Sequence, residues 1–219
     1  MPLDKYTLMR YNEGGKKGGL PMTRERRAEI ARLIEQGEWL HVTGSRKNIM
    51  QTDFYGVVEE LLHRDEVRGL ADFTHHRMTT RYQHCLNVSY YNYKLCRLLR
   101  LDADSAARAG LLHDLYHYDT AHYSKTSPAI RHSEYHPQVA LEAAEKLIDM
   151  NDRERDMIGN HMWPVTVPRP KYAETYIITF VDKYCAVIEY LLPQPARLGR
   201  YVRNRFYAHR KKHAKAVQS

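Results

Sequence analysis

Apolar residues recur along most of the chain at intervals of three and four, which is the spacing of one face of an α-helix. The connecting segments are rich in glycine, proline and small polar residues. No run alternates apolar and polar residues for long enough to predict a β-sheet. The sequence therefore predicts an all-α fold, with helices near residues 23–38, 54–62, 80–99, 105–116, 133–150, 152–160, 172–192 and 196–213.

Four segments of the chain differ in composition. Glycines and a proline in residues 1–22 predict a flexible N-terminal arm. Residues 23–74 are expected to form helices that pack on the core, and residues 75–195 to form the main helical domain. Residues 196–219 contain many lysines and arginines, and they predict a basic C-terminal helix and tail.

The three cysteines are widely spaced and form no CxxC pair, which indicates reduced core thiols rather than disulfides or structural zinc. No segment approaches the ~18 consecutive apolar residues of a membrane span. The N-terminal residues lack the apolar region of a signal peptide. We therefore expect a cytoplasmic protein that makes no membrane contact.

The formal net charge is +8, and much of the basic surplus lies in residues 24–27 and 197–215. A basic balance favours anionic partners, and a small substrate that contains phosphate fits it. Nucleic acid is a less favoured partner, because the tail contains no recognised nucleic-acid motif. A solvated basic tail is the alternative interpretation, and the oligomeric state stays open.

Six side chains of metal-binding type stand within or at the ends of successive predicted helices, in a chain with 13 histidines. They are His84, His113, Asp114, His136, His161 and Asp182. Each interval between the helices suits one helix plus one connection. Successive antiparallel helices could therefore bring all six to one place, as metal sites in helical bundles require.

The donor types of this set indicate a transition metal. Imidazole together with carboxylate suits iron, manganese, zinc, cobalt or nickel, whereas oxygen-only sets suit magnesium or calcium. His113 and Asp114 would point about 100° apart on a helix, so they could approach cations from two directions. An unpaired aspartate in a helical core is costly, and a cation removes that cost.

The ordered set His84…His113-Asp114…Asp182 resembles the HD-domain superfamily of metal-dependent phosphohydrolases. The motifs that carry the resemblance are Arg81-Tyr82-Gln83-His84, Gly110-Leu111-Leu112-His113-Asp114 and Val181-Asp182-Lys183-Tyr184. The resemblance covers residues 75–195. It implies an all-α helical bundle of the HD-domain type, with about seven to nine helices, and a metal-binding HD domain in that segment.

Two further histidines make the chain similar to members of the superfamily that bind two metals. By that resemblance, Asp114 would bridge two divalent transition-metal cations. One cation would bind His84, His113 and Asp182, and the other would bind His136 and His161.

The resemblance also points to residues for catalysis besides Asp114. In a branch with a GYP signature, which cleaves cyclic dinucleotides, a lysine stands three residues after the HD aspartate, and His117 occupies that place here. It could contact phosphate or act as a general acid. Arg81 could clamp a phosphate, because its planar fork suits an oxyanion. The chain departs from this branch after His161, where Met162-Trp163-Pro164 follows instead of a second histidine and GYP.

Three functions are consistent with these features. The first is a phosphohydrolase that acts on a nucleotide or other phosphate ester through metal-activated water, with Asp114 orienting the nucleophile. Lys125 or Lys183 would help to offset the phosphate charge. The second is an HD-type di-iron oxygenase that cleaves a carbon bond with the same ligands. The third is a non-enzymatic module with a structural metal, whose basic tail binds nucleic acid or another partner.

Overall fold

The computed structural model describes residues 42–45, 47–75, 79–120 and 131–191. This part of the chain holds seven α-helices, which confirms the all-α prediction. They are α2 (Asp53–Leu62), α3 (Asp65–Arg68), α4 (Arg81–Leu98), α5 (Ala103–Leu112), α7 (His132–Leu147), α8 (Asp152–Asn160) and α9 (Ala173–Leu191). None of the described helices is long and apolar enough to span a bilayer. The arm predicted at 1–22 and the helices predicted at 23–38 and 196–213 lie outside the described residues.

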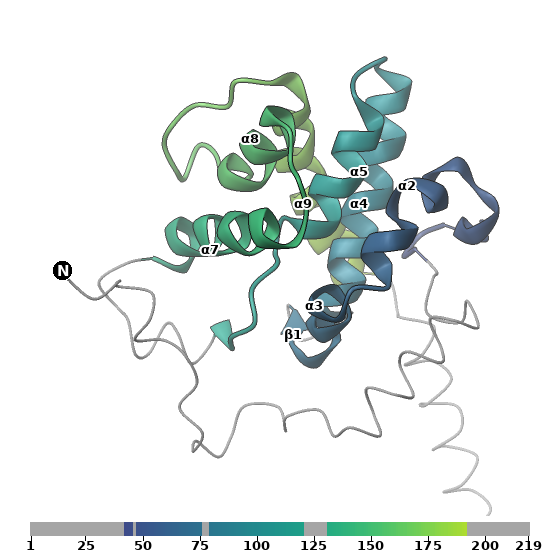
Figure 1. The fold of residues 1–219 in the computed structure, drawn as a ribbon, viewed down its shortest axis with the longest axis horizontal. Helices are drawn as coiled ribbons and strands as arrows, with labels where there is room; N and C mark the ends of the chain where they lie inside the picture. The colour runs from purple at the N-terminus through teal and green to yellow at the C-terminus, as the bar shows by residue number, and fades with distance from the viewer. Residues whose placement is uncertain (1–41, 46, 76–78, 121–130, 192–219) are drawn as a thin grey trace, which may run out of the picture.

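Helix α4 lies at the centre of the structure, packed against α5 and α9, while α7 and α8 lie on one side of α5 and α2 on the other (Figure 1). Every residue of α4 from Arg81 to Tyr90 is buried, so the first half of this helix has no side that faces solvent. At the other end of the helix, Leu98 is 76% exposed. The last turn of α4 therefore leaves the core that encloses its beginning.

Helices α4 and α5 approach so closely that their backbones are nearly in contact. A Cβ atom on Gly110 would lie 2.7 Å from the Cα of Ser89. The Ser89 hydroxyl donates to the carbonyl of Ala107 at 2.6 Å, and Nδ2 of Asn92 donates to the carbonyl of Ala106 at 2.8 Å. Because the helices run antiparallel, this contact places the start of α4 beside the end of α5.

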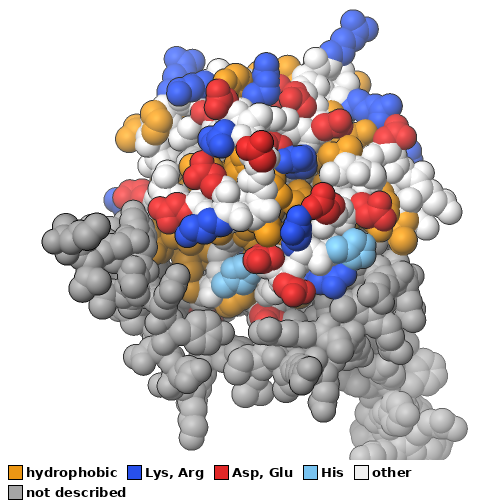
Figure 2. Space-filling model, in the orientation of Figure 1, with side chains coloured by type: hydrophobic (Ala, Val, Ile, Leu, Met, Phe, Trp, Pro, Cys, Tyr) orange, Lys and Arg blue, Asp and Glu red, His pale blue; other side chains and the backbone are white. Residues whose placement is uncertain are grey.

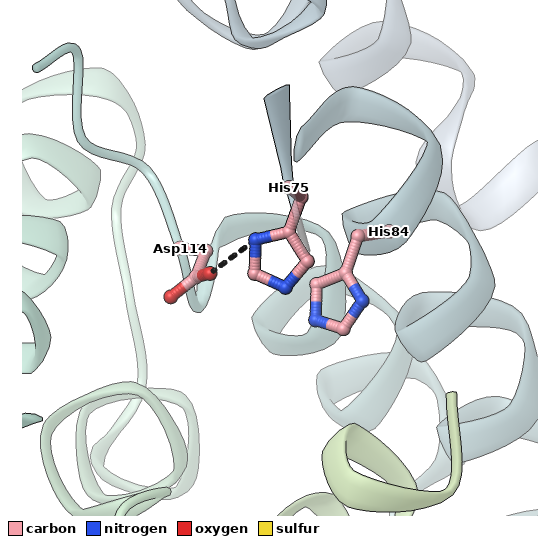
Figure 3. Close-up of side chains that lie close together, drawn as sticks. All are labelled: His75, His84 and Asp114. Atoms are coloured by element: carbon pink, nitrogen blue, oxygen red, sulfur yellow. Dashed lines mark ion pairs between the residues drawn. The ribbon is translucent and has the colours of Figure 1, made fainter. Parts of the chain in front are cut away.

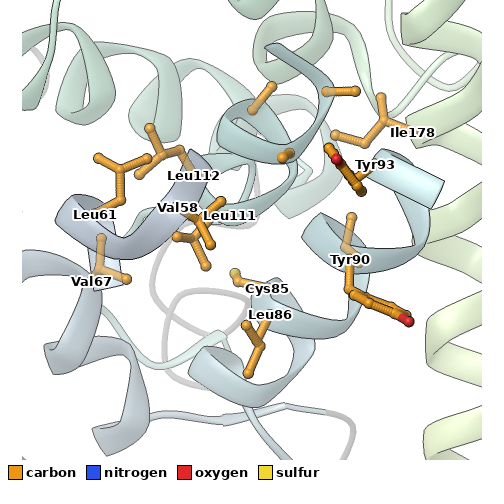
Figure 4. Packing of buried hydrophobic residues seen from close by; sticks show 14 of the residues in the cluster. Val58, Leu61, Val67, Cys85, Leu86, Tyr90, Tyr93, Leu111, Leu112 and Ile178 are labelled. Carbon is orange, nitrogen blue, oxygen red and sulfur yellow. The ribbon is translucent and has the colours of Figure 1, made fainter. Parts of the chain in front are cut away.

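Apolar side chains of α2, α4, α5 and α9 fill the space around this contact (Figure 4). Phe54 of α2 packs edge-on against Tyr90 of α4, with the ring centroids 5.3 Å apart. The three cysteines are buried free thiols within the same core, as the sequence predicts. On the described part of the face shown in Figure 2, acidic and basic side chains are interspersed.

A short hairpin precedes α4, and the hydrophobic pattern does not predict it. Strand β1 (Thr74–His75) pairs antiparallel with β2 (Thr79–Thr80), so that His75 lies opposite Thr79. Two short 3₁₀ helices, η2 (Ile49–Gln51) and η3 (Gly69–Asp72), lie earlier in the chain. The Thr80 side chain accepts from the backbone N–H of Gln83 and caps α4, which anchors the hairpin at the start of that helix.

Two predicted helix boundaries are wrong in ways that matter for the site. Helix α5 ends at Leu112 rather than Tyr116, because short turns follow it: the N–H of Leu115 donates to Leu112, and that of Tyr116 to Asp114. Helix α7 ends at Leu147 rather than 150, and Pro137 lies in its second turn. His113 and Asp114 therefore lie in a turn beyond α5.

Local capping sets the bounds of α8 and the start of α9. Asn151 and Glu154 form a reciprocal capping box, and α8 spans the predicted residues 152–160. Oδ2 of Asp156 accepts from the backbone N–H of Lys171 at 2.9 Å and from the hydroxyl of Thr175 at 2.6 Å. This buried carboxylate joins α8 to the first turn of α9.

Replacing Gly110 by alanine tests the close packing of α4 and α5. The added Cβ would overlap backbone atoms of Ser89, so we expect the free energy of unfolding to fall by about 1–3 kcal/mol. Gly56→Ala in α2 is the matched control, because no described atom lies within 4 Å of its added Cβ. That control should gain roughly 0.5–1 kcal/mol from helix propensity. Urea unfolding of both variants measures the difference, and equal stability of the two would contradict the packing argument.

Candidate metal centre

The structure brings the six predicted metal-binding side chains together at the ends and inner faces of five helices. His84 lies in the first turn of α4, His113 and Asp114 follow α5, His136 lies in α7, His161 follows α8, and Asp182 lies in α9. The five that precede Asp182 are all buried, and the Asp182 side chain is 17% exposed. The close packing of α4 on α5 and the turn after α5 account for much of this convergence.

Three of the histidines are held in one orientation by backbone carbonyls. Nδ1 of His113 donates to the carbonyl of Gly110 at 2.9 Å, and Nδ1 of His161 donates to that of Ile158 at 2.8 Å. Nδ1 of His136 donates to the carbonyl one turn earlier in α7, at 2.8 Å. A ring that donates through Nδ1 presents a lone pair at Nε2 when neutral, and this is the usual support for a metal-binding histidine.

One group of donors surrounds Asp182. Its Oδ1 lies 3.1 Å from Nε2 of His84 and 3.8 Å from Nε2 of His113. Donor atoms of these three residues all lie within 4.8 Å of one another. A single cation could therefore contact all three, because metal–ligand distances of about 2.0–2.2 Å separate opposite donors by roughly twice that value.

The second group surrounds Asp114. Its Oδ1 lies 3.3 Å from Nε2 of His136 and 3.9 Å from Nε2 of both His113 and His161. The Nε2 atoms of His136 and His161 are only 2.9 Å apart. Because both rings donate through Nδ1, two neutral rings would set two lone pairs against each other. A cation between or beside them removes that repulsion.

Unpaired polar atoms also indicate that this donor set suits a cation. Among the described residues, Nε2 of His113 and Oδ1 of Asp114 are buried with no hydrogen-bond partner. Leaving such atoms unpaired is costly, and the cost is largest for a charged carboxylate. The residues present therefore fit one or more divalent metal ions, which would satisfy these atoms directly.

The shifts in pKa distinguish histidines that are neutral near pH 7 from one that carries a proton. Burial lowers the pKa of His136, and burial with the nearby His136 and His113 lowers that of His161 to about 3. These two rings are therefore neutral near pH 7, which is the form that binds metals. Although burial acts to lower the pKa of His84, Glu189 and Asp182 raise it to about 10. A metal at His84 would therefore replace a proton.

Both aspartates remain ionised in this setting. Burial by itself would raise the pKa of Asp114, but the nearby imidazoles, above all that of His113, hold it below its usual value. Burial also acts to raise the pKa of Asp182, and the neighbouring imidazoles of His113 and His84 hold it well below its usual value. Each carboxylate can therefore serve as an anionic ligand across the neutral range.

Glu189 contacts Nδ1 of His84, the ring nitrogen that does not face Asp182. It is not among the residues predicted from the sequence. Its two oxygens lie 3.1 and 3.2 Å from Nδ1 of His84, and Nδ2 of Asn87 donates to Oε1 at 2.7 Å. Glu189 is fully buried. It follows Asp182 by seven residues, so both carboxylates lie on one face of α9 with the imidazole between them. The seven-residue interval after Asp182 is the sequence feature that could have identified Glu189.

Arg81 points away from the cluster, toward backbone and aromatic rings. Its Nη1 donates to the carbonyl of Tyr116 at 2.5 Å and its Nη2 to that of Tyr118 at 3.3 Å. Its guanidinium also lies 3.6 Å from the centroid of the Tyr116 ring and 4.8 Å from that of Phe73. These contacts favour a role in holding the turn after α5, and the predicted phosphate clamp stays a prediction.

The other residues considered for catalysis differ in their surroundings. Nε2 of His117 donates to the carbonyl of Glu66 at 2.8 Å, and its ring packs against Phe73. These contacts do not support the predicted role as a general acid. Lys183 is exposed and lies 3.7 Å from Oδ2 of Asp182, so it can offset charge at the edge of the site. Lys125 lies outside the described residues.

His75 is a second residue that the sequence analysis missed. It lies on β1, and its Nδ1 is 4.0 Å from Oδ2 of Asp114 (Figure 3). Its ring stacks on that of His84, with centroids 4.0 Å apart. Nothing in the apolar pattern marks a two-residue strand, so the position of this side chain is evident only from the structure.

Comparison with known proteins gives one result. Residues 81–187 match the family model of the HD domain. No curated protein and no solved structure matches the chain significantly. The matched segment contains all six donors of the cluster, whereas His75 and Glu189 lie outside it.

Replacing Glu189 by glutamine tests its support of His84. The amide can still accept from Nδ1 but carries no charge, so we expect metal affinity to fall by about 10–100-fold. Glu174→Gln is the matched control, because Glu174 is also buried in α9 but pairs with Arg153 instead. Competition with a chromophoric chelator measures both affinities. If the two variants bound metal equally well, Glu189 would have no such role.

Proposed function

We propose that this chain, which belongs to the HD-domain family through residues 81–187, is a metal-dependent phosphohydrolase that cleaves a small phosphate ester with two divalent cations. Most members of the family are metal-dependent phosphohydrolases. The observation that carries the two-metal proposal is the presence of two adjoining donor groups. One surrounds Asp182 and the other surrounds Asp114.

The ligand assignment follows from the distances between donors. His84, His113 and Asp182 would hold one cation, and His136 and His161 would hold the other. Asp114 would contribute to both, because it lies between His113 and the second pair. A set of imidazoles with two carboxylates favours iron, manganese, zinc, cobalt or nickel over magnesium or calcium.

The two cations would supply a water of lowered pKa and stabilise the charge of the phosphoryl group. The chain supplies the arrangement in which that chemistry occurs. Asp114 stays ionised and can orient the attacking water through a carboxylate oxygen. Arg81 holds the carbonyl of Tyr116 and thereby the turn that carries Asp114. Lys183, at the edge of the site, adds a positive charge for an anionic substrate.

Two rival functions differ from the phosphohydrolase in what else they require. A di-iron oxygenase would use the same ligands, so the identity of the bound metal and its response to oxygen distinguish the two enzymes. A nucleic-acid-binding module would need a continuous basic surface. The basic segments at 24–27 and 197–215, on which that alternative depends, lie outside the described residues, and the described part of the face in Figure 2 carries acidic and basic side chains together.

Metal content and hydrolysis test the proposal together. We expect about two metal ions per chain in the wild type and about one in the double variant His136→Ala/His161→Ala. The exposed His63→Ala is the control and should retain the wild-type content. Elemental analysis gives the metal content, and a panel of phosphomonoesters, phosphodiesters and nucleotides gives the activity.

Three results would contradict parts of the proposal. Absence of hydrolysis across the panel by protein loaded with manganese, cobalt or zinc would exclude the phosphohydrolase. Mixed-valent iron accompanied by oxygen uptake would assign the site to an oxygenase instead. Equal metal content in the wild type and the double variant would remove His136 and His161 from the ligand set.

A further inference from the structure

We infer that His75 is an additional ligand of the cation held by His84, His113 and Asp182, an inference that rests on the two-metal site proposed above. The residue lies outside the segment that matches the HD domain. It would add a hairpin to the elements that build the site. Three features support this role: the placement of His75, its distances to the other donors, and the different partners that the two oxygens of Asp114 face.

The hairpin fixes the position of His75 relative to α4. His75 pairs with Thr79 across the two strands, and β2 runs directly into the first turn of α4. The backbone N–H of Arg81 donates to the carbonyl of Phe73 at 2.8 Å, which closes the base of the hairpin. The imidazole is consequently held beside His84, three residues into the same helix.

The ring of His75 lies between His84 and Asp114 (Figure 3). It stacks on the ring of His84 at an interplanar angle of 25°. Donor atoms of His75, His84 and Asp114 all lie within 4.8 Å of one another, as do those of the group that contains Asp182. Because His84 belongs to both groups, one cation beside it is within reach of His75 as well.

The two oxygens of Asp114 face different partners. Oδ1 is directed toward His113, His136 and His161. Oδ2 lies 4.0 Å from Nδ1 of His75, which is too long for a hydrogen bond. A separation of this size suits two donors on opposite sides of one metal ion, at about 2.0–2.1 Å each. One cation could therefore contact Asp114 and His75 at the same time.

A ligand from the hairpin would make the two metal positions unequal. The first cation would have three imidazoles, from His75, His84 and His113, and the second would have two. More imidazole donors favour iron, cobalt, nickel and zinc, and they leave fewer coordination positions for substrate. The second cation, beside His136 and His161, would then be the more accessible one.

Cobalt(II) binding to the purified full-length protein tests the inference without an activity assay. The variants are His75→Ala and His75→Gln, and the exposed His63→Gln is the control. We expect both His75 variants to bind one of two cobalt ions at least about tenfold more weakly than the wild type. The visible absorption of the bound cobalt should change as well, because that cation loses a nitrogen ligand. The control should match the wild type in both measurements.

Unchanged cobalt affinity and an unchanged spectrum in folded His75→Gln would overturn the inference, even if hydrolysis fell. His75 would then face the substrate and bind no metal. If His75→Ala failed to fold, the glutamine variant would still decide the question. A protein that binds two cobalt ions but hydrolyses no phosphate ester would contradict the proposed function, while its affinities and spectra would still test His75.

Discussion

A carboxylate buried among imidazoles needs positive charge within a few ångströms, and the Asp114 side chain is in that position. The residue is 4% exposed, and its Oδ1 has no hydrogen-bond partner among the described residues. Each of α5, α7 and α8 directs an imidazole toward it, from His113, His136 and His161. Protons on those rings or cations between them can supply the charge, and the carbonyl-bound Nδ1 atoms favour cations. The fold around Asp114 therefore suits metal binding better than a simple ion pair.

Backbone contacts, as much as ligands, determine the geometry of this cluster. Gly110 and Ser89 bring α4 against α5, so that His84 and His113 become neighbours although 29 residues separate them. The guanidinium of Arg81 donates to two carbonyls after α5 and lies over the aromatic rings of Phe73 and Tyr116. A basic residue beside a proposed phosphate site can thus act entirely through the backbone, and a site of this kind is sensitive to residues that touch no metal.

The features that could be predicted from the sequence are those set by residues close together in the chain. The bounds of α8 agree with the sequence because a capping box of neighbouring residues sets them. The six donors could be identified because each stands in or beside a helix with its own apolar pattern. The end of α5 could not be predicted, because the turn at His113 involves a hydrogen bond from its side chain to the carbonyl of Gly110. Glu189 and His75 depend on how α9 and the hairpin pack on α4, and no local pattern encodes that packing.

The donors His113 and His161 each follow the C-terminus of a helix. This position affects the order in which the metal and the proposed substrate bind. His113 and His161 are the residues immediately after helices of ten and nine residues, so two helix C-termini point at the site. Each C-terminus carries a partial negative charge of roughly half an electron, which attracts cations and repels anions. A phosphate that approaches the metal-free cluster meets this field together with two ionised aspartates. Metal loading adds positive charge to the cluster, so the phosphate substrate proposed above would bind after the cations.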